Sequence, residues 1–174
     1  MSKIAAAVLA FLCLLILGSI PMSAQLLPSG NVYAGVSYGQ LTNATVQQSY
    51  RGWNGSVEAF PFTRIRYLSF VLDASGFYRT SQTRITQYNG FIGPRLSINY
   101  GKWRPFAHAT VGIRHIDSGG FVSNPMGIDV GGGADYKLPF KNFSWRAQFD
   151  MIRSRYLSAN QYDYRASTGI VWRF

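Results

Sequence analysis

The last eleven residues of the chain alternate between two kinds of side chain. One parity holds Tyr164, Ala166, Thr168, Ile170, Trp172 and Phe174. The other parity holds Arg165, Ser167, Gly169, Val171 and Arg173. Because successive side chains of a β-strand point to opposite faces, this pattern predicts a strand with one apolar and one largely polar face. Such a strand suits a transmembrane β-barrel, in which the last strand pairs with the first and leaves no free edge.

The same alternation recurs seven times earlier in the chain. The seven apolar series lie within residues 32–38, 53–59, 68–78, 88–100, 107–113, 126–138 and 145–151. No charged residue interrupts them, and a charge near the middle of a bilayer costs about 2–4 kcal/mol. Pro94 cannot donate a ladder hydrogen bond, so we expect a bulge or a local break at Gly93-Pro94. The pattern predicts an all-β protein, an eight-stranded antiparallel up-and-down transmembrane β-barrel.

The connections between the predicted strands alternate in length. Three are tight turns, near residues 61–64, 101–104 and 139–142. Four are longer and polar, at about residues 41–50, 79–84, 117–124 and 154–163. Outer-membrane barrels have short periplasmic turns and long external loops, so we expect the tight turns and both termini in the periplasm. Aromatic residues gather at the strand ends, Phe106 among them, as in interfacial girdles.

Residues 1–24 have the features of a secretory signal peptide, a positive charge followed by a short apolar run. The run is short for a membrane-spanning helix of about 20 residues. We therefore expect cleavage before Gln25 and a single barrel domain over residues 25–174. Cys13 lies in the segment expected to be removed, so the mature chain would contain no disulfide.

The chain has a formal net charge of +10, but charged residues make up only 14% of it. The arginines are dispersed rather than clustered, which argues against nucleic acid as a partner. We expect instead outer-membrane lipid and lipopolysaccharide, whose phosphates suit arginine. The arginines predicted at the outer strand ends are Arg51, Arg79, Arg84, Arg153 and Arg155.

The polar parity of the strands collects most of the charged residues. The predicted lumenal polar network comprises Glu58, Asp73, Arg95, His108, Arg114, Asp129, Asp135, Arg146, Asp150 and Arg165. The interior of an eight-stranded barrel is just wide enough to be filled by side chains, and buried charges need partners. Hairpin geometry predicts four ion pairs, namely Asp135–Arg146, Asp150–Arg165, Arg114–Asp129 and Asp73–Arg95.

The chain resembles the small OmpA-type outer-membrane β-barrel family over about residues 30–174. The signal segment, the eight alternating strands and the terminal segment 168–174 carry this resemblance. It implies insertion into a bacterial outer membrane, with Trp172 and Phe174 recognised by the barrel-assembly machinery. It does not extend to the peptidoglycan-binding domain of full-length OmpA proteins, so no such anchoring is expected.

These features specify a fold more closely than a function. We expect a monomer with a structural or surface-interaction role, a lumen plugged by salt bridges and an unidentified surface ligand or none. The alternatives are a narrow ion-conducting pore, a lipid A-modifying enzyme and, if the two faces were exchanged, a soluble lipocalin-like barrel.

The sequence offers no catalytic or metal-binding motif. His115, near Asp117 and Ser118, lacks the fixed arrangement of a nucleophile and its base. The two histidines are far apart and the mature chain lacks cysteine, so no metal site and no cofactor are expected.

Overall fold

The computed structural model describes most of the chain after residue 28. The described ranges are 29–43, 46–61, 65, 67–80, 84–118, 121–156 and 159–174, without the side chains of 41–48, 79–85, 118–121 and 155–160. The predicted signal peptide, residues 1–24, lies outside these ranges. Within them, no helix is long and apolar enough to cross a membrane.

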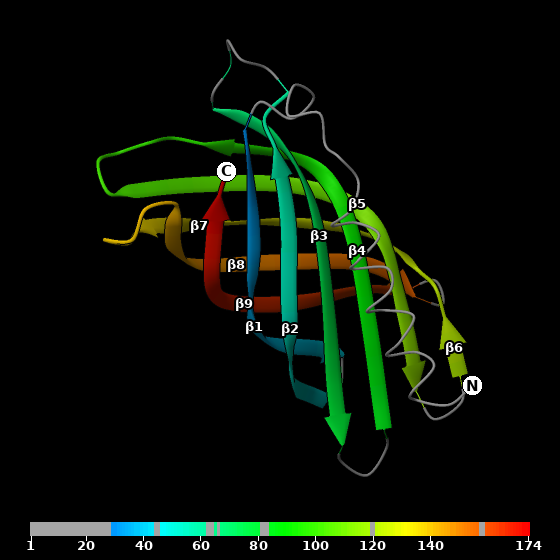
Figure 1. Ribbon diagram of the computed structural model, residues 1–174. Helices are drawn as coiled ribbons and strands as arrows, with labels where there is room; N and C mark the ends of the chain where they lie inside the picture. The colour runs from blue at the N-terminus through cyan, green and yellow to red at the C-terminus, as the bar shows by residue number, and fades with distance from the viewer. Residues whose placement is uncertain are drawn as a thin grey trace, which may run out of the picture.

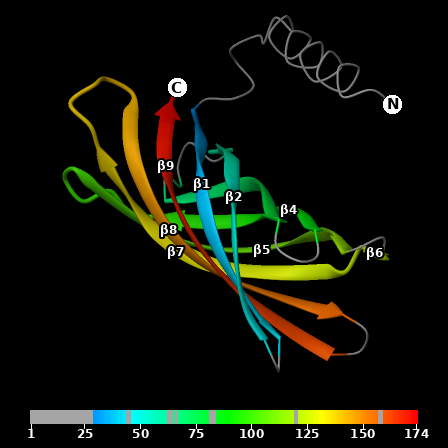
Figure 2. The ribbon, with the colours of Figure 1, turned by 90° about the horizontal axis from the view of Figure 1, so that it is seen from below.

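In the described ranges the strands form one closed antiparallel sheet (Figures 1 and 2). They are β1 (Gly30–Asn43), β2 (Val46–Ala59), β3 (Leu68–Thr80), β4 (Arg84–Ser97), β5 (Trp103–Ser118), β6 (Phe121–Ser123), β7 (Met126–Lys137), β8 (Phe143–Tyr156) and β9 (Ala159–Arg173). Each strand pairs with its neighbours in the order β4-β3-β2-β1-β9-β8-β7-β5, and β4 pairs with β5 to close the ring.

The short strand β6 belongs to the same barrel strand as β7. Both pair with β5 in one continuous register, interrupted at Asn124-Pro125. Counted this way, the barrel has eight antiparallel strands, which confirms the predicted fold class.

The carboxy-terminal strand closes the barrel, as its alternation predicts. β9 pairs with β1 from Asn31 opposite Arg173 to Thr42 opposite Tyr162. Beyond this ladder, the backbone of Phe174 exchanges hydrogen bonds of 3.0 and 3.1 Å with that of Gly30. Figure 1 shows the two strands side by side, with the carboxy terminus beside the start of β1.

The four long polar loops expected at one end of the barrel are instead continuations of the strands, so that prediction is wrong. β1 and β2 stay paired up to Asn43 and Val46, and β8 and β9 stay paired up to Tyr156 and Ala159. The apolar alternation fades there because these residues extend past the apolar band. The backbone still needs hydrogen-bond partners, and the ladder supplies them.

Proline 94 interrupts its ladder without bending the strand out of register. The pairing of β4 with β5 lapses at Gly93-Pro94 and resumes at Arg95 opposite His108, in the register that holds Ile92 opposite Val111. The expected local break is therefore present, and the bulge is not. The neighbouring ladder with β3 runs on through both residues.

The outward face of the barrel is apolar and the inward face is polar. Side chains in the middle of the strands, such as Leu72, Ile92 and Val111, are more than half exposed on the outside. The parity assignment is thus confirmed, and it is the reverse of a soluble barrel with an apolar cavity. Phe106 is an exception among the expected girdle aromatics, because it points inward and is buried.

A charge on the outward face should destabilise the barrel in a bilayer. Val111→Arg lies near the middle of β5 and should lower the free energy of unfolding by about 2–4 kcal/mol. Val122→Arg, at an equally exposed position in the strand extension of β6, should cost less than about 1 kcal/mol. Urea unfolding in lipid vesicles measures both, and equal losses would contradict the assignment of an apolar membrane band.

Candidate functional site

The barrel interior brings together the predicted polar network. All ten predicted residues are buried, none with more than 6% of its surface exposed. Two further charged residues, Arg104 and Asp163, join them from the inward parity of β5 and β9. The sequence analysis missed both, although the same parity rule would have identified them.

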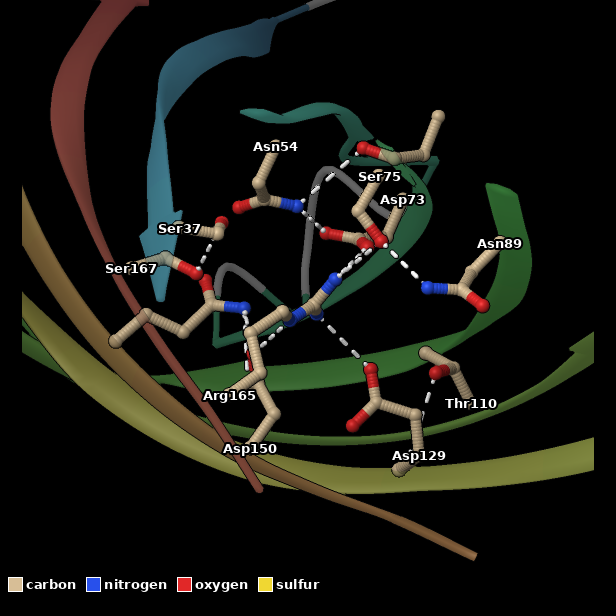
Figure 3. Close-up of polar contacts among 12 residues, drawn as sticks. Ser37, Asn54, Asp73, Ser75, Asn89, Thr110, Asp129, Asp150, Arg165 and Ser167 are labelled. Atoms are coloured by element: carbon tan, nitrogen blue, oxygen red, sulfur yellow. Dashed lines mark hydrogen bonds and ion pairs between the residues drawn. The ribbon is translucent and has the colours of Figure 1, made fainter. Parts of the chain in front are cut away.

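Arg165 on β9 lies at the centre of one group of charges, which we call the Arg165 cluster: Arg165, Asp73, Asp129, Asp150 and His108. Each nitrogen of its guanidinium contacts a different carboxylate (Figure 3). The distances are 2.8 Å from Nη1 to Asp73, 3.1 Å from Nη2 to Asp129 and 2.7 Å from Nε to Asp150. Because the partners come from β3, β7 and β8, this one side chain ties together four strands around the lumen.

Neutral polar side chains hold the carboxylates of the Arg165 cluster in place. Asn54 donates a 2.8 Å hydrogen bond to Asp73, and Gln148 donates to both oxygens of Asp150 at 2.9 and 3.0 Å. Ser75 accepts a 3.0 Å hydrogen bond from Arg165 (Figure 3). These contacts fix the geometry of charges that would otherwise be costly to bury.

A second group, which we call the Glu58 cluster, lies nearer the start of β1 and the end of β9. Its members are Glu58, Asp135, Arg95, Arg104, Arg146 and Arg173. Glu58 lies 3.4–3.7 Å from three guanidiniums and accepts hydrogen bonds from Ser69 and Asn31. Asp135 accepts two hydrogen bonds from Arg146, at 2.6 and 3.0 Å.

The ring of Phe106 lies close to two guanidiniums of the Glu58 cluster. The Cζ atoms of Arg95 and Arg146 are 4.5 and 4.6 Å from its ring centroid. An aromatic ring attracts cations over its faces. The inward position of Phe106 therefore lets two like charges approach a common centre in the interior.

Two of the four predicted hairpin ion pairs are confirmed. Asp135 faces Arg146 and Asp150 faces Arg165, in both the backbone register and the side-chain contacts. The other two predicted pairs are wrong. Their members bind other partners. Arg114 contacts Asp163, and Arg95 contacts Glu58. Both Asp73 and Asp129 contact Arg165.

Both failed pairs lie in hairpins whose register differs by four residues from the one that the pair requires. Arg114 donates its backbone hydrogen bond to Pro125, four residues before Asp129. Asp73 faces Phe91, four residues before Arg95. In each hairpin the facing residue therefore lies nearer the turn than the predicted partner does.

Negative and positive charges are concentrated at different levels of the barrel lumen. The Arg165 cluster contains three carboxylates around one guanidinium, whereas the Glu58 cluster contains four guanidiniums and two carboxylates. Arg114 and Asp163 form a separate balanced pair, supported by a 2.6 Å hydrogen bond from Arg114 to Ser154. The middle of the lumen is thus locally acidic, and the end of the lumen near the start of β1 and the end of β9 is locally basic.

The other predicted site residues lie on the outside. Arg51 and Arg153 are exposed, and Arg153 lies 5.8 Å from the ring centroid of Tyr162. Trp172 and Phe174 are exposed with ring centroids 5.3 Å apart. The side chains of Arg79, Arg84 and Arg155 lie outside the described residues.

His115 is also on the outward face, and its environment differs from that of a catalytic base. Its Nδ1 atom lies 2.7 Å from the side-chain oxygen of Asn124. An amide does not provide the carboxylate that orients a catalytic imidazole. The contact with Asn124 therefore favours an interfacial role for His115.

The fold has several counterparts among solved structures. Neisserial surface protein A, NspA, has a TM-score of 0.70 and 15% identity, over 83% of this chain and 97% of that chain. Ail, the attachment invasion locus protein of Yersinia pestis, has a TM-score of 0.61 and 13% identity, over 84% and 98%. The N-terminal β-barrel domain of Pseudomonas aeruginosa OprF has a TM-score of 0.53 and 13% identity, over 82% and 97%.

This protein therefore has the fold of the small eight-stranded outer-membrane barrels. At these identities the likeness concerns the fold alone. No protein-family model and no curated protein sequence matches the chain.

Removing the central guanidinium should destabilise the barrel more than removing one at its end. Arg165→Met leaves three buried carboxylates without their shared partner and should cost about 3–5 kcal/mol of unfolding free energy. Arg173→Met removes a guanidinium that is 30% exposed and has one carboxylate partner, so its cost should be about 1 kcal/mol or less. Urea titrations monitored by gel mobility give both values, and equal costs would contradict the central role of Arg165.

Proposed function

We propose that this protein is a monomeric bacterial outer-membrane β-barrel with a closed lumen and a structural or surface-interaction role, without enzymatic activity. It would be exported through the signal peptide over residues 1–24 and inserted by the barrel-assembly machinery, which would bind the exposed Trp172 and Phe174. The outward apolar face and the barrel fold support membrane insertion.

The observation that carries the closed lumen is the position of Arg165. Its guanidinium bridges carboxylates from three other strands, so the middle of the bore is occupied by fixed side chains. Next to it, Tyr50, Phe77 and Ile152 line a cavity of about 20 Å³, space for about one water molecule. A continuous aqueous path would require this network to separate.

The basic outer surface supports an anionic partner, of which lipopolysaccharide is the one we propose. Arg51 borders a hollow on the outward side of β1 and β9, lined also by Val36, Tyr38, Ala166 and Thr168. An arginine beside an apolar surface is suited to a lipid phosphate with its acyl chain. Among the barrels of this fold, Ail has been solved in complex with the heparin analogue sucrose octasulfate, a polyanion.

Planar-bilayer recording tests the closed lumen. The wild-type protein should be electrically silent, because paired charges fill the bore. Arg165→Ala removes the bridging side chain and should produce measurable ion conductance, whereas Arg153→Ala on the outside should remain silent. A steady conductance of the wild-type protein would contradict the proposal and identify the protein as a narrow pore.

Lipopolysaccharide binding tests the outer arginines. The double variant Arg51→Ser, Arg153→Ser should weaken binding to the detergent-solubilised barrel by about fivefold for each arginine, given about 1 kcal/mol for each contact with the anionic surface. The matched control Lys102→Ser, Lys141→Ser removes the same charge at the opposite end of the barrel and should change binding less than twofold. Equal effects of the two double variants would show that net charge alone matters.

A further inference from the structure

Three side chains that can bind metal ions converge inside the barrel. They are His108 on β5, Asp129 on β7 and Asp150 on β8, and one ligand atom of each lies within 4.8 Å of the others. His108 Nε2 is 3.3 Å from Asp150 Oδ1 and 3.8 Å from Asp129 Oδ2. A tetrahedral ion with bonds of about 2.0–2.1 Å would separate its ligand atoms by about 3.3 Å, so a small inward movement of Asp129 would complete the arrangement.

Gly131 makes room for this convergence. Gly131 lies on β7, opposite His108 of β5 on one side and opposite Asp150 of β8 on the other. A Cβ atom at this position would overlap the Asp150 carboxylate. The absence of a side chain at residue 131 therefore allows the imidazole and the carboxylate to meet across it.

Hydrogen bonding leaves oxygen atoms at this site without a partner. Asp129 is fully buried, yet its Oδ1 has no hydrogen-bond partner among the described residues, and the same holds for Oε1 of the buried Gln148. Gln148 is at the site because its amide nitrogen contacts the Asp150 carboxylate. Such buried atoms usually have a hydrogen-bond partner, so Oδ1 of Asp129 is an oxygen that a cation can bind without breaking a hydrogen bond between the described residues.

The excess of negative charge around Arg165 also favours a bound cation. Arg165 is the guanidinium that contacts Asp73, Asp129 and Asp150, so three carboxylates share one positive charge. A divalent cation bound by a neutral His108 would balance the two remaining negative charges. Arg165 would then hold Oδ2 of Asp150, the oxygen that does not face His108, as hydrogen-bonding partners commonly do around metal sites.

We propose that His108, Asp129 and Asp150 form a buried site for one divalent transition-metal ion of the zinc class. Imidazole nitrogen and carboxylate oxygen are both ligands that zinc takes, whereas calcium takes six to eight oxygen ligands. The surrounding bore is filled by side chains, so the ion enters while the strands assemble. It serves as an internal cross-link between β5, β7 and β8.

Metal retention after folding tests this site. The full chain without its signal segment is refolded from urea into detergent micelles with zinc chloride, and loosely bound metal is removed by gel filtration. Mass spectrometry of the metal should find about one zinc ion for each folded barrel. His108→Gln and Asp129→Asn should each reduce this retention at least about tenfold. The control variant His115→Gln, which removes the exposed histidine, should retain as much zinc as the wild-type protein.

Cobalt provides a second measurement on the wild-type protein, independent of any variant that fails to fold. Refolding with cobalt chloride should give the strong visible absorption of a four-coordinate ion, and zinc should displace it. Heat-modifiable gel mobility reports folding in every sample. Wild-type barrel that folds without stoichiometric metal would overturn the proposal and leave His108 as a hydrogen-bonding partner of the two carboxylates. So would a six-coordinate cobalt spectrum, or loss of the metal in His115→Gln.

Discussion

A closed ring of eight strands leaves a lumen that side chains must fill, and here they fill it with charge. The contact on which the rest depends is that of Arg165 with Asp73, Asp129 and Asp150. An isolated ion in this interior would cost several kcal/mol, so each charge needs its partner on another strand. A register slip of one residue would move Arg165 to the lipid face, and the network therefore specifies the register of β9 against both neighbours.

The opposite charge excesses of the two clusters explain how so many arginines can share one interior. The Glu58 cluster is basic and the Arg165 cluster is acidic, so the two attract each other along the lumen. The ring of Phe106 attracts the guanidiniums of both Arg95 and Arg146, which offsets part of the repulsion between them. The acidic excess at the centre coincides with the convergence of His108, Asp129 and Asp150.

The sequence predicts those parts of the lumenal network that depend on strand alternation or on a single hairpin. Inward orientation depends on a period of two, so the buried position of residues such as Glu58 and Arg114 follows without knowledge of any register. The pair Asp135–Arg146 could be predicted because Pro139 and Asn142 mark the turn between them. Arg114 and Asp163 are 49 positions apart, and no hairpin argument connects them. Contacts across the lumen depend on the stagger of the whole barrel, which no single hairpin reveals.

The unexpected strand extensions limit how this protein can recognise a partner. A long loop can fold around a ligand, but paired strands present side chains at fixed spacings on a stiff backbone. At the base of these extensions, the outward side chains include Tyr38, whose hydroxyl donates to Ser49 over 2.6 Å, and Tyr78, which packs edge-on against Tyr88. A rigid, tyrosine-rich and basic rim suits a repetitive anionic surface better than a ligand that must be enclosed. The same backbone pairing that replaces the loops therefore agrees with the lipid phosphate partner that we propose for this end of the barrel.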